Sequence, residues 1–337
     1  MRLSNLSTAA FALTTLAMAC AAGPAPPDWG KPIESRTSAR PVDAAVRASN
    51  VPVEQESHWV RVPGCARDIA GGGNGVVYAT GCDVVPNSRG SSHFYRWNGA
   101  EFAPLRVAGH GSAIATYAGN SYTVGGDAML YTSINDGEWV KRGTPNDQPI
   151  TDIGAGQAGI WIITSQPNGE GGNAISRAMP CPNAGIAGGA KDFCGWEEMP
   201  GAAVRISVGR SAWVINAQGQ IFERFSNAGG YWQKRPGCFT DVAANGHDVY
   251  AVTCKRGNGD GNAIHRWNNA GSWIDVQGAG KRVAVDAASN VWAITDSGEI
   301  WRRDPQGCAA LTPSSTALAD RAARADARQA PLRDSAR

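Results

Sequence analysis

The stretch Trp232-Gln-Lys-Arg-Pro-Gly-Cys-Phe-Thr-Asp-Val-Ala-Ala-Asn-Gly-His-Asp-Val-Tyr250 decides the fold, together with its continuation at Ile264-His265-Arg266. Its opening recurs as Trp59-Val-Arg-Val-Pro-Gly-Cys65. Its later landmarks recur as Val77-Tyr78 and Phe94-Tyr95-Arg96. A self-similar unit of several tens of residues indicates a repeat architecture, in which each unit is one supersecondary element.

Six copies of this unit can be followed between Trp59 and Arg303. Each copy opens with an aromatic residue, carries a second one further on, and in most copies closes with an arginine. The opening residues are Trp59, Phe102, Trp139, Trp196, Trp232 and Trp273, and the second aromatic residues are Tyr78, Tyr122, Trp161, Trp213, Tyr250 and Trp292. The closing arginines are Arg96, Arg177, Arg224, Arg266 and Arg302, whereas the second copy has Leu130-Tyr131-Thr132.

Short apolar runs lie between these landmarks, for example 204–208 and 212–215, and Gly, Asn and Asp bound them. Such runs are typical of β-strands, and no helical periodicity is sustained before the C-terminal tail. Four short strands in each of six units predict an all-β fold, namely a six-bladed β-propeller of four-stranded antiparallel blades. The last unit lacks a following Trp-initiated strand, whereas the first unit begins with one at 59–62. We therefore expect this N-terminal strand to close the ring as the outer strand of the last blade.

Two pairs of motifs carry a family resemblance. Trp196-Glu-Glu-Met-Pro-Gly201 is followed by Arg205-Ile-Ser-Val-Gly209, and Asn290-Val-Trp-Ala-Ile294 is followed by Gly298-Glu-Ile-Trp-Arg302. This order resembles the tectonin β-propeller repeat family, and several copies in tandem make the resemblance more specific than one. It implies a lectin that binds glycans in clefts between neighbouring blades. The second and third units depart most from the pattern, so the family's glycan pockets are least readily assigned to them.

Two sets of residues are candidates for glycan contact, because sugars pack flat C–H faces on aromatic rings and need polar partners for their hydroxyls. The resemblance implies pocket walls made by mid-strand aromatic residues, which are Trp161, Trp213, Trp292, Tyr78, Tyr122 and Tyr250. The alternative is that these rings form the core between blades. The second set lies at turn edges, as Trp97-Asn98 and Trp267-Asn268. Those two tryptophans are either exposed sugar platforms or covers over the blade packing.

The chain contains eight cysteines, and their number fits an oxidising, exported setting. Cys65 and Cys82 are equidistant from the Gly73-Asn74 turn, and Cys238 and Cys254 are equidistant from Gly246. Residues equidistant from a hairpin turn lie opposite each other with Cα atoms about 5.5 Å apart, a separation that a disulfide accepts. Both pairs are therefore predicted to be disulfides.

The remaining cysteines lie in less regular contexts. Cys181 and Cys194 flank a Gly/Ala-rich insertion and are predicted to bridge it, which leaves Cys308 either free or intermolecular. Residues 1–20 have the form of a signal peptide, with a charge at Arg2 and a short apolar run at 9–18. Either cleavage after the small-x-small site at 17–19 precedes Cys20, or 16–20 is a lipoprotein box and Cys20 carries acyl chains.

These boundaries divide the chain into four parts. Residues 1–20 are the signal, 21–57 a Pro/Ala-rich linker, 58–308 the propeller and 309–337 a disordered Ala/Arg-rich tail. The expected location is secreted, periplasmic or, with a lipid on Cys20, outer-membrane, after bacterial export. Membrane association is expected only through that lipid.

Composition and motifs argue against several other classes. The net charge is only +2, from 31 basic and 29 acidic residues, so no basic patch indicates nucleic-acid binding. The chain has no G-x-S-x-G elbow, no H-E-x-x-H and no paired C-x-x-C spacing. No catalytic residue, metal site or cofactor is therefore predicted.

Two acidic motifs have structural interpretations. Asp68, Asp152 and Asp241 recur just before the expected inner strand, where we interpret them as acceptors for turn N–H groups rather than as catalytic carboxylates around a channel. Ser133-Ile-Asn-Asp-Gly-Glu-Trp139 comes close to the Asp-box of sialidase-like propellers, which is a structural turn.

The sequence thus predicts an exported carbohydrate-binding propeller that recognises cell-surface glycans, such as lipopolysaccharide, without catalysis. Several similar pockets on one ring would add weak single-site affinities through multivalency. The alternative hypothesis is a scaffold for protein–protein interaction at the bacterial envelope. The third hypothesis is a propeller glycoside hydrolase.

Overall fold

A computed structural model of the chain describes residues 58–72, 75–169, 171–181, 193–225 and 230–304. The predicted signal, linker and tail therefore lie outside the described residues, as do Cys20, Cys308 and the Gly73-Asn74 turn. Within the described ranges, no helix is long and apolar enough to cross a membrane. A single-turn 3-10 helix, η2 (Pro145–Asp147), interrupts a chain otherwise built from strands.

Three of the sheets are separate four-stranded antiparallel units. They consist of β9 (Ile150–Gly156), β10 (Gly159–Asn168), β11 (Gly172–Pro180) and β12 (Phe193–Ala203); of β13 (Arg205–Val208), β14 (Ala212–Ile215), β15 (Ile221–Arg224) and β16 (Trp232–Arg235); and of β17 (Phe239–Asn245), β18 (Asp248–Arg256), β19 (Asn262–Trp267) and β20 (Trp273–Gly280). The all-β fold of four-stranded antiparallel sheets is confirmed.

The other strands form one path in the order β21-β22-β23-β1-β2-β3-β5-β6-β7-β8, with β4 paired to β3 off this path. Their bounds are β1 (His58–Gly71), β2 (Val77–Val84), β3 (Ser92–Trp97), β4 (Phe102–Pro104), β5 (His110–Tyr117), β6 (Asn120–Gly125), β7 (Leu130–Ile134), β8 (Val140–Arg142), β21 (Arg282–Val285), β22 (Val291–Ile294) and β23 (Glu299–Asp304). Only two residue pairs join β3 to β5, Ser92 with Gly111 and His93 with His110.

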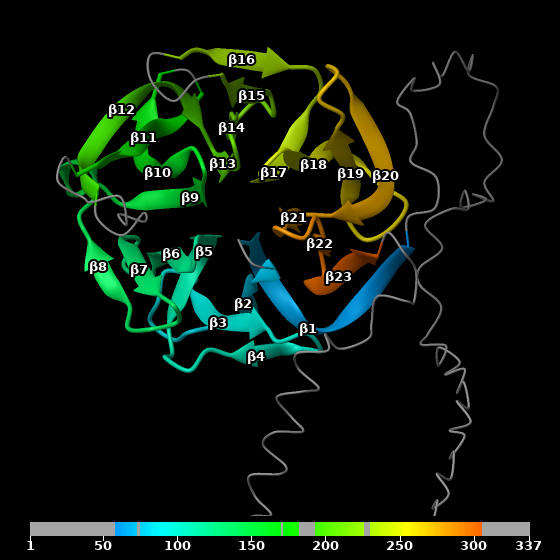
Figure 1. Cartoon of the computed structure of the whole chain (residues 1–337), viewed down its shortest axis with the longest axis horizontal. Coiled ribbons are helices and arrows are strands. Elements are labelled where there is room, and N and C mark those ends of the chain that lie inside the picture. The colour runs from blue at the N-terminus through cyan, green and yellow to red at the C-terminus, as the bar shows by residue number, and fades with distance from the viewer. Residues whose placement is uncertain (1–57, 73–74, 170, 182–192, 226–229, 305–337) are drawn as a thin grey trace, which may run out of the picture.

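The sheets stand around a common axis, with the first strand of each nearest the axis (Figure 1), and this arrangement is a β-propeller. We call β5, β9, β13, β17, β21 and the C-terminal half of β1 the inner strands. Each inner strand contacts the inner strands of its two neighbours. The approach is close, because a Cβ on Gly156 of β9 would overlap the carbonyl of Val208 in β13.

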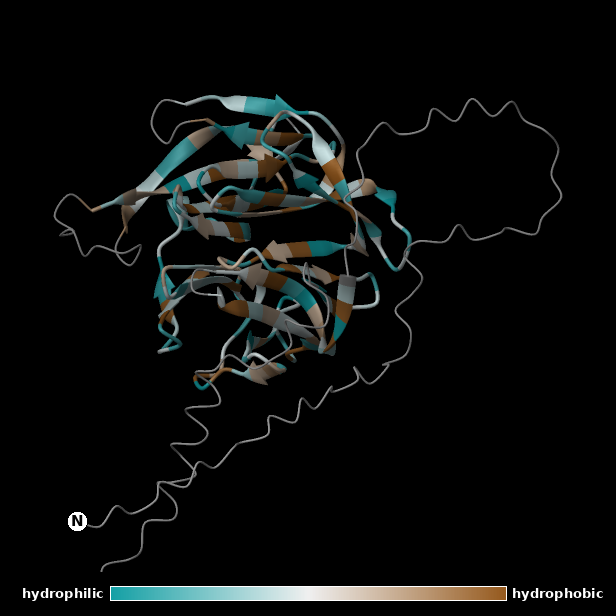
Figure 2. Cartoon of the chain, turned by 45° about the vertical axis from the view of Figure 1, so that its right-hand side comes forward, coloured by the Kyte–Doolittle hydropathy of each residue, from teal (hydrophilic) through white to brown (hydrophobic). Residues whose placement is uncertain are grey.

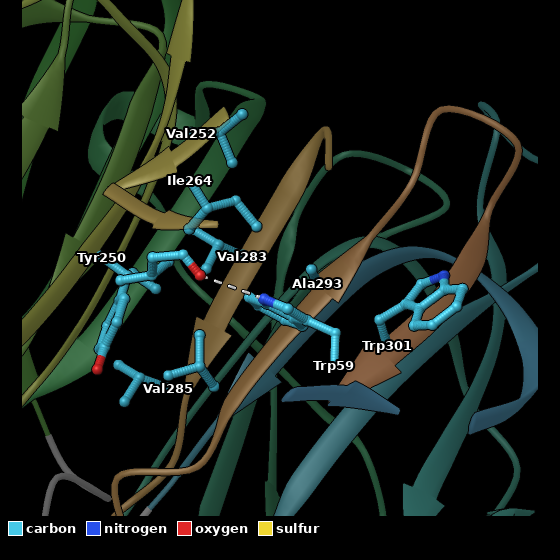
Figure 3. Packing of buried hydrophobic residues seen from close by; sticks show 11 residues of the cluster. Trp59, Tyr250, Val252, Ile264, Val283, Val285, Ala293 and Trp301 are labelled. Carbon is cyan, nitrogen blue, oxygen red and sulfur yellow. Dashed lines mark hydrogen bonds between the residues drawn. The ribbon is translucent and has the colours of Figure 1, made fainter. Parts of the chain in front are cut away.

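Strand β1 belongs to two sheets. Its residues Ala66–Gly71 pair with β2, whereas His58–Cys65 pair with β23 in the last part of the described chain. Trp59 belongs to one buried cluster with Val283 and Tyr250, and its indole N–H lies 3.4 Å from the carbonyl of Val276 (Figure 3). The N-terminal strand is therefore bonded to and packed against the C-terminal sheet.

The second strands of the sheets are buried on both faces, as in β6, β14 and β22, whereas the outer strand β8 is largely exposed. In Figure 2, hydrophobic residues colour segments of the strands brown. Radial packing of each sheet between two neighbours explains why these strands do not alternate strictly between apolar and polar residues.

All three predicted disulfides form, Cys65–Cys82, Cys181–Cys194 and Cys238–Cys254. The Cα atoms of the first pair are 5.5 Å apart and those of the third 5.3 Å apart, as opposite positions in a hairpin require. The second pair joins β11 to the start of β12, across residues 182–192, which lie outside the description.

Candidate functional site

The mid-strand aromatic residues lie in the core between sheets. Trp161, Trp213 and Trp292 are at most 2% exposed, and Tyr78, Tyr122 and Tyr250 are buried as well. Three of the closing arginines lie over these rings, Arg177 and Arg224 over Trp161 and Arg302 over Trp292. A glycan would reach these tryptophans only if neighbouring sheets separated, so the arrangement agrees with the core interpretation.

The two turn-edge tryptophans differ from each other. Trp267 is only 4% exposed and packs against Trp213 and Trp273, so of the two alternatives it is a cover over the blade packing. Trp97 is half-buried, with its ring centroid 5.1 Å from that of Trp292. Each ring covers the packing of its sheet on a neighbour, and the two lie in separate hydrophobic clusters.

The asparagines beside these tryptophans hold their turns. Asn98 Oδ1 accepts hydrogen bonds from the backbone N–H groups of Ala100 and Glu101, both at 2.9 Å. Asn268 Oδ1 accepts from Ala270 and Ser272 in the same way. Side chains that satisfy turn N–H groups are less available to a ligand, and glycan contact by Asn98 and Asn268 stays a prediction.

The three recurrent aspartates accept hydrogen bonds from the neighbouring inner strand. Asp68 accepts the backbone N–H of Ile114 at 3.0 Å, and Asp152 and Asp241 accept those of Ile206 and Val283 at 2.9 Å. In each case the donor belongs to the neighbouring inner strand, which is β5, β13 or β21. These carboxylates therefore join the inner strands in three pairs around the axis, β1 with β5, β9 with β13 and β17 with β21.

Two arginines share the axis with these aspartates. Arg205 lies 3.7 Å from both Asp152 and Asp241, and Arg282 lies 3.5 Å from Asp68 and 3.7 Å from Asp241. Ala113, which precedes the bonded Ile114, stands where the other two sheets have an arginine. We call Asp68, Asp152, Asp241, Arg205 and Arg282 the axial charge cluster, and it has three acids for two cations.

Burial governs the protonation of this cluster. It raises the pKa of Asp152 to about 6, although the Arg205 charge opposes the shift. Burial also raises the pKa of Asp68, and raises that of Asp241 well above its ordinary value. The axial cavity beside the cluster is only about 60 Å³, which leaves no room for a sugar. The axis is therefore a structural feature.

A larger pocket lies elsewhere, between β2 and β3 on one side and β5 to β8 on the other. Its volume is about 540 Å³. We call it the β3–β5 pocket, and its lining residues are Val85, Pro86, Asn87, Ser88, Phe94, Ala108, Gly109, His110, Thr123, Gly125, Gly126, Asp127, Tyr131 and Trp139. Pockets of this size hold small ligands.

Aromatic rings and glycines shape the β3–β5 pocket. Trp139 packs on buried Phe94 with ring centroids 5.0 Å apart, and its indole lies directly against Gly109, where a Cβ would overlap it. Tyr131 lies against Gly125 in the same way, with 2.5 Å from the place of a Cβ to its ring. Both rings can therefore approach the backbone only because these positions are glycine.

A carboxylate fixes the polar side of the pocket. Asp127 Oδ2 accepts hydrogen bonds from Lys141 Nζ at 2.7 Å and from the Tyr131 hydroxyl at 3.0 Å, while Oδ1 accepts the N–H of Met129. Burial alone would raise the pKa of Asp127, but these bonds outweigh it and lower the pKa. Asp127 is therefore an anchored, ionised acceptor at the rim.

The indole of Trp139 differs from those of the other opening tryptophans. Trp196 donates its Nε1–H to Gly143 at 2.9 Å, Trp232 to Pro200 at 2.7 Å and Trp273 to Pro236 at 2.8 Å. The Nε1 atom of Trp139 is buried and has no hydrogen-bond acceptor among the described residues. A buried donor without an acceptor is costly in a folded protein, so the indole N–H of Trp139 is an unpaired donor in the wall of the pocket.

Sequence reasoning missed this pocket, because it placed the least transferable pockets in the second and third units. The available signal was the clustering of glycines at 109–111 and 125–126, with Tyr131 and Trp139 following in the sequence. Ser133–Trp139 forms a structural turn, as expected, since the Ser133 hydroxyl donates to the carbonyl of Gly137 at 2.8 Å.

No group of three His, Cys, Asp or Glu side chains among the described residues could hold a metal ion. No known family profile matches the chain. No curated protein matches it either. The resemblance to tectonin repeats therefore stays a prediction.

Several solved structures are similar in fold. A streptogramin B lyase structure matches with TM-score 0.42 and 13% identity, over 74% of this chain and 96% of that one. YCF48 from Cyanidioschyzon merolae matches with TM-score 0.44 and 14% identity, over 74% and 99%. The Neurospora crassa Pan2 WD40 domain matches with TM-score 0.46 and 8% identity, over 74% and 82%. Similarity this remote gives no indication of ligand or activity.

Proposed function

We propose that this protein is a carbohydrate-binding propeller that holds one or two sugar units of a cell-surface glycan in the β3–β5 pocket. The observation that carries the proposal is the unpaired indole N–H of Trp139 in a pocket with aromatic walls and an ionised acceptor. Trp139 and Tyr131 offer faces for the C–H side of a pyranose. Asp127, His110 and Asn87 offer polar groups for its hydroxyls.

The proposal keeps the expected lectin function but moves the site. Trp139, Tyr131 and Asp127 replace the mid-strand aromatic residues and the turn-edge residues as principal candidates. The reason is that these three residues line one pocket, whereas the mid-strand rings are buried between sheets. We propose that binding is non-catalytic and needs no cofactor.

We also propose that the ring has six blades and is closed by the N-terminal strand. Contacts between successive inner strands support this count, and so does the pairing of His58–Cys65 with β23. With six blades, the long strand path divides into three. One blade ends at β1, which it shares with the next blade, and that blade meets the third where two residue pairs join β3 to β5. The tectonin assignment and bacterial export belong to the same proposal, and the three disulfides support an oxidising location.

A protein-interaction scaffold is the second candidate. One surface feature favours it, since Phe225 and Tyr231 are 51% and 67% exposed and stack with centroids 5.9 Å apart. Exposed aromatic pairs are frequent at protein interfaces. Binding that free monosaccharides do not compete would favour this candidate over the lectin.

Calorimetric titration of the parent and two variants with an identified glycan tests the site. Trp139→Phe keeps an aromatic ring and removes the donor, so we expect about tenfold weaker binding, the effect of one hydrogen bond of ~1.4 kcal/mol. Tyr131→Ala removes a stacking face and should weaken binding further. The control is Tyr231→Ala, an exposed aromatic residue outside the pocket. Unchanged affinity in both pocket variants, or an equal loss in the control, would contradict the assignment.

A further inference from the structure

A second concave site lies beside the axis, where the chain enters β5 and β21. Its volume is about 300 Å³. We call it the cationic pocket, and its lining residues are Arg67, Thr80, Gly90, Ser92, Gly111, Ser112, Lys281 and Arg282. The lining contains three basic residues and no acidic one, although the net charge of the whole chain is only +2. Positive charge is therefore concentrated at this place.

The three basic residues are not equally neutralised. Arg282 belongs to the axial charge cluster and lies within ion-pair distance of Asp68 and Asp241. Arg67 Nη1 donates only to the carbonyl of Gly90 at 3.2 Å, and Lys281 Nζ only to the carbonyl of Asp296 at 3.3 Å. Because carbonyl oxygens carry no net charge, these two positive charges have no carboxylate partner within ion-pair distance among the residues that the structure describes.

Buried hydroxyls provide an independent observation. Thr80 and Ser92 both line the pocket and are each 1% exposed. Their Oγ atoms have no hydrogen-bond partner among the described residues. Buried hydroxyls are almost always bonded, and an unbonded one is unfavourable. Two such groups together, next to unneutralised cations, are what an oxyanion would satisfy, since its oxygens accept from both kinds of donor.

We propose that the cationic pocket binds a tetrahedral oxyanion, a phosphate or sulfate group, held by Arg67 and Lys281 with hydrogen bonds from Thr80 and Ser92. Arginine and lysine together are well suited to such groups, because the guanidinium binds two oxygens at once and the ammonium acts as a point charge. Phosphate is favoured by charge, since its second ionisation near neutral pH makes it close to dianionic. The group is either a free ion or an ester on a larger ligand. The site is separate from the β3–β5 pocket, and neither proposal requires the other.

Binding of inorganic phosphate by the full chain, measured by calorimetry at constant ionic strength with chloride as reference, tests this proposal. We expect saturable binding that Arg67→Gln and Lys281→Gln each weaken at least tenfold. The matched control is Lys234→Gln, an exposed lysine on β16, which should bind as the parent does. A parent that does not bind phosphate or sulfate, or a control that loses as much as the pocket variants, overturns the proposal.

The hydroxyls allow a test that separates binding from folding. Thr80→Val replaces the Oγ by a methyl group of similar size, so the melting temperature without anion should stay equal or rise. Phosphate affinity should nevertheless fall several-fold, and the melting-temperature shift on adding phosphate should shrink. Undiminished affinity in Thr80→Val would exclude the hydroxyl from the site. Comparison of inorganic phosphate with a hexose phosphate then distinguishes the free ion from an ester, by which of the two binds more tightly.

Discussion

The axial charge cluster predicts an unusual dependence of stability on pH. Burial raises the pKa of Asp152 from 3.8 to about 6 in the folded state. A carboxyl with a raised folded pKa contributes stability that is fully present below its unfolded pKa and is lost as pH rises through its folded pKa. Between about pH 4 and pH 6.5, the contribution of Asp152 to the free energy of unfolding should therefore fall. A shift of about two units corresponds to about 3 kcal/mol.

Asp152→Asn isolates this contribution. The amide oxygen of asparagine can still accept the N–H of Ile206, and Arg205 keeps Asp241 as a partner. We expect the variant to match the parent near pH 4 and to be more stable by up to ~3 kcal/mol at pH 7. The comparison with the parent is necessary because other groups also titrate. Burial lowers the pKa of His265, for example, which favours the folded state as pH rises.

Urea unfolding midpoints from pH 4 to pH 7.5 measure the effect, with Asp83→Asn, an exposed carboxyl on β2, as the control. The difference between Asp152→Asn and the parent should grow with pH, while the control stays parallel to the parent. A difference that is constant over this range, or one in which Asp152→Asn becomes relatively less stable at pH 7, would refute the reasoning.

Two further predictions concern the ring and its core. Removal of residues 58–62 deletes Trp59 and the pairing with β23, so the melting transition should fall in temperature and broaden; an unchanged transition would contradict closure of the ring by this strand. Trp161→Ala leaves a cavity at a fully buried site and should cost about 3–5 kcal/mol in denaturant unfolding. Trp97→Ala, at a half-buried site, should cost less, and equal losses would argue against the core interpretation.

Local signals in the sequence determined much of the fold. Repeated aromatic residues and short apolar runs predicted strands in four-stranded sheets. This succeeded because a strand is specified by a few consecutive residues and the turns that bound them. The pairs Cys65–Cys82 and Cys238–Cys254 followed from hairpin register, in which position relative to the turn fixes the partner. These inferences succeeded because they rest on contacts within one hairpin.

Contacts between sheets were beyond sequence reasoning. Trp267 looked exposed beside a turn, yet its ring lies on Trp213 of the preceding sheet. Asp152 was expected to accept turn N–H groups, and its bond to the N–H of Ile206 from the next inner strand was not predicted. The β3–β5 pocket depends on the contact of Trp139 with Gly109. The two residues are far apart in the sequence, so no local pattern encodes this contact. Each of these features depends on the packing of one inner strand or blade against its neighbour.

The central claim is that the protein binds glycans, and an array of glycans probed with the oxidised chain of residues 21–308 tests it most directly. The array should include bacterial lipopolysaccharides and O-methylated sugars. We predict saturable binding to a defined sugar class, competed by the free sugar and weakened by Trp139→Phe. A blank array from a folded protein that melts sharply would contradict the lectin proposal and favour the protein-interaction scaffold.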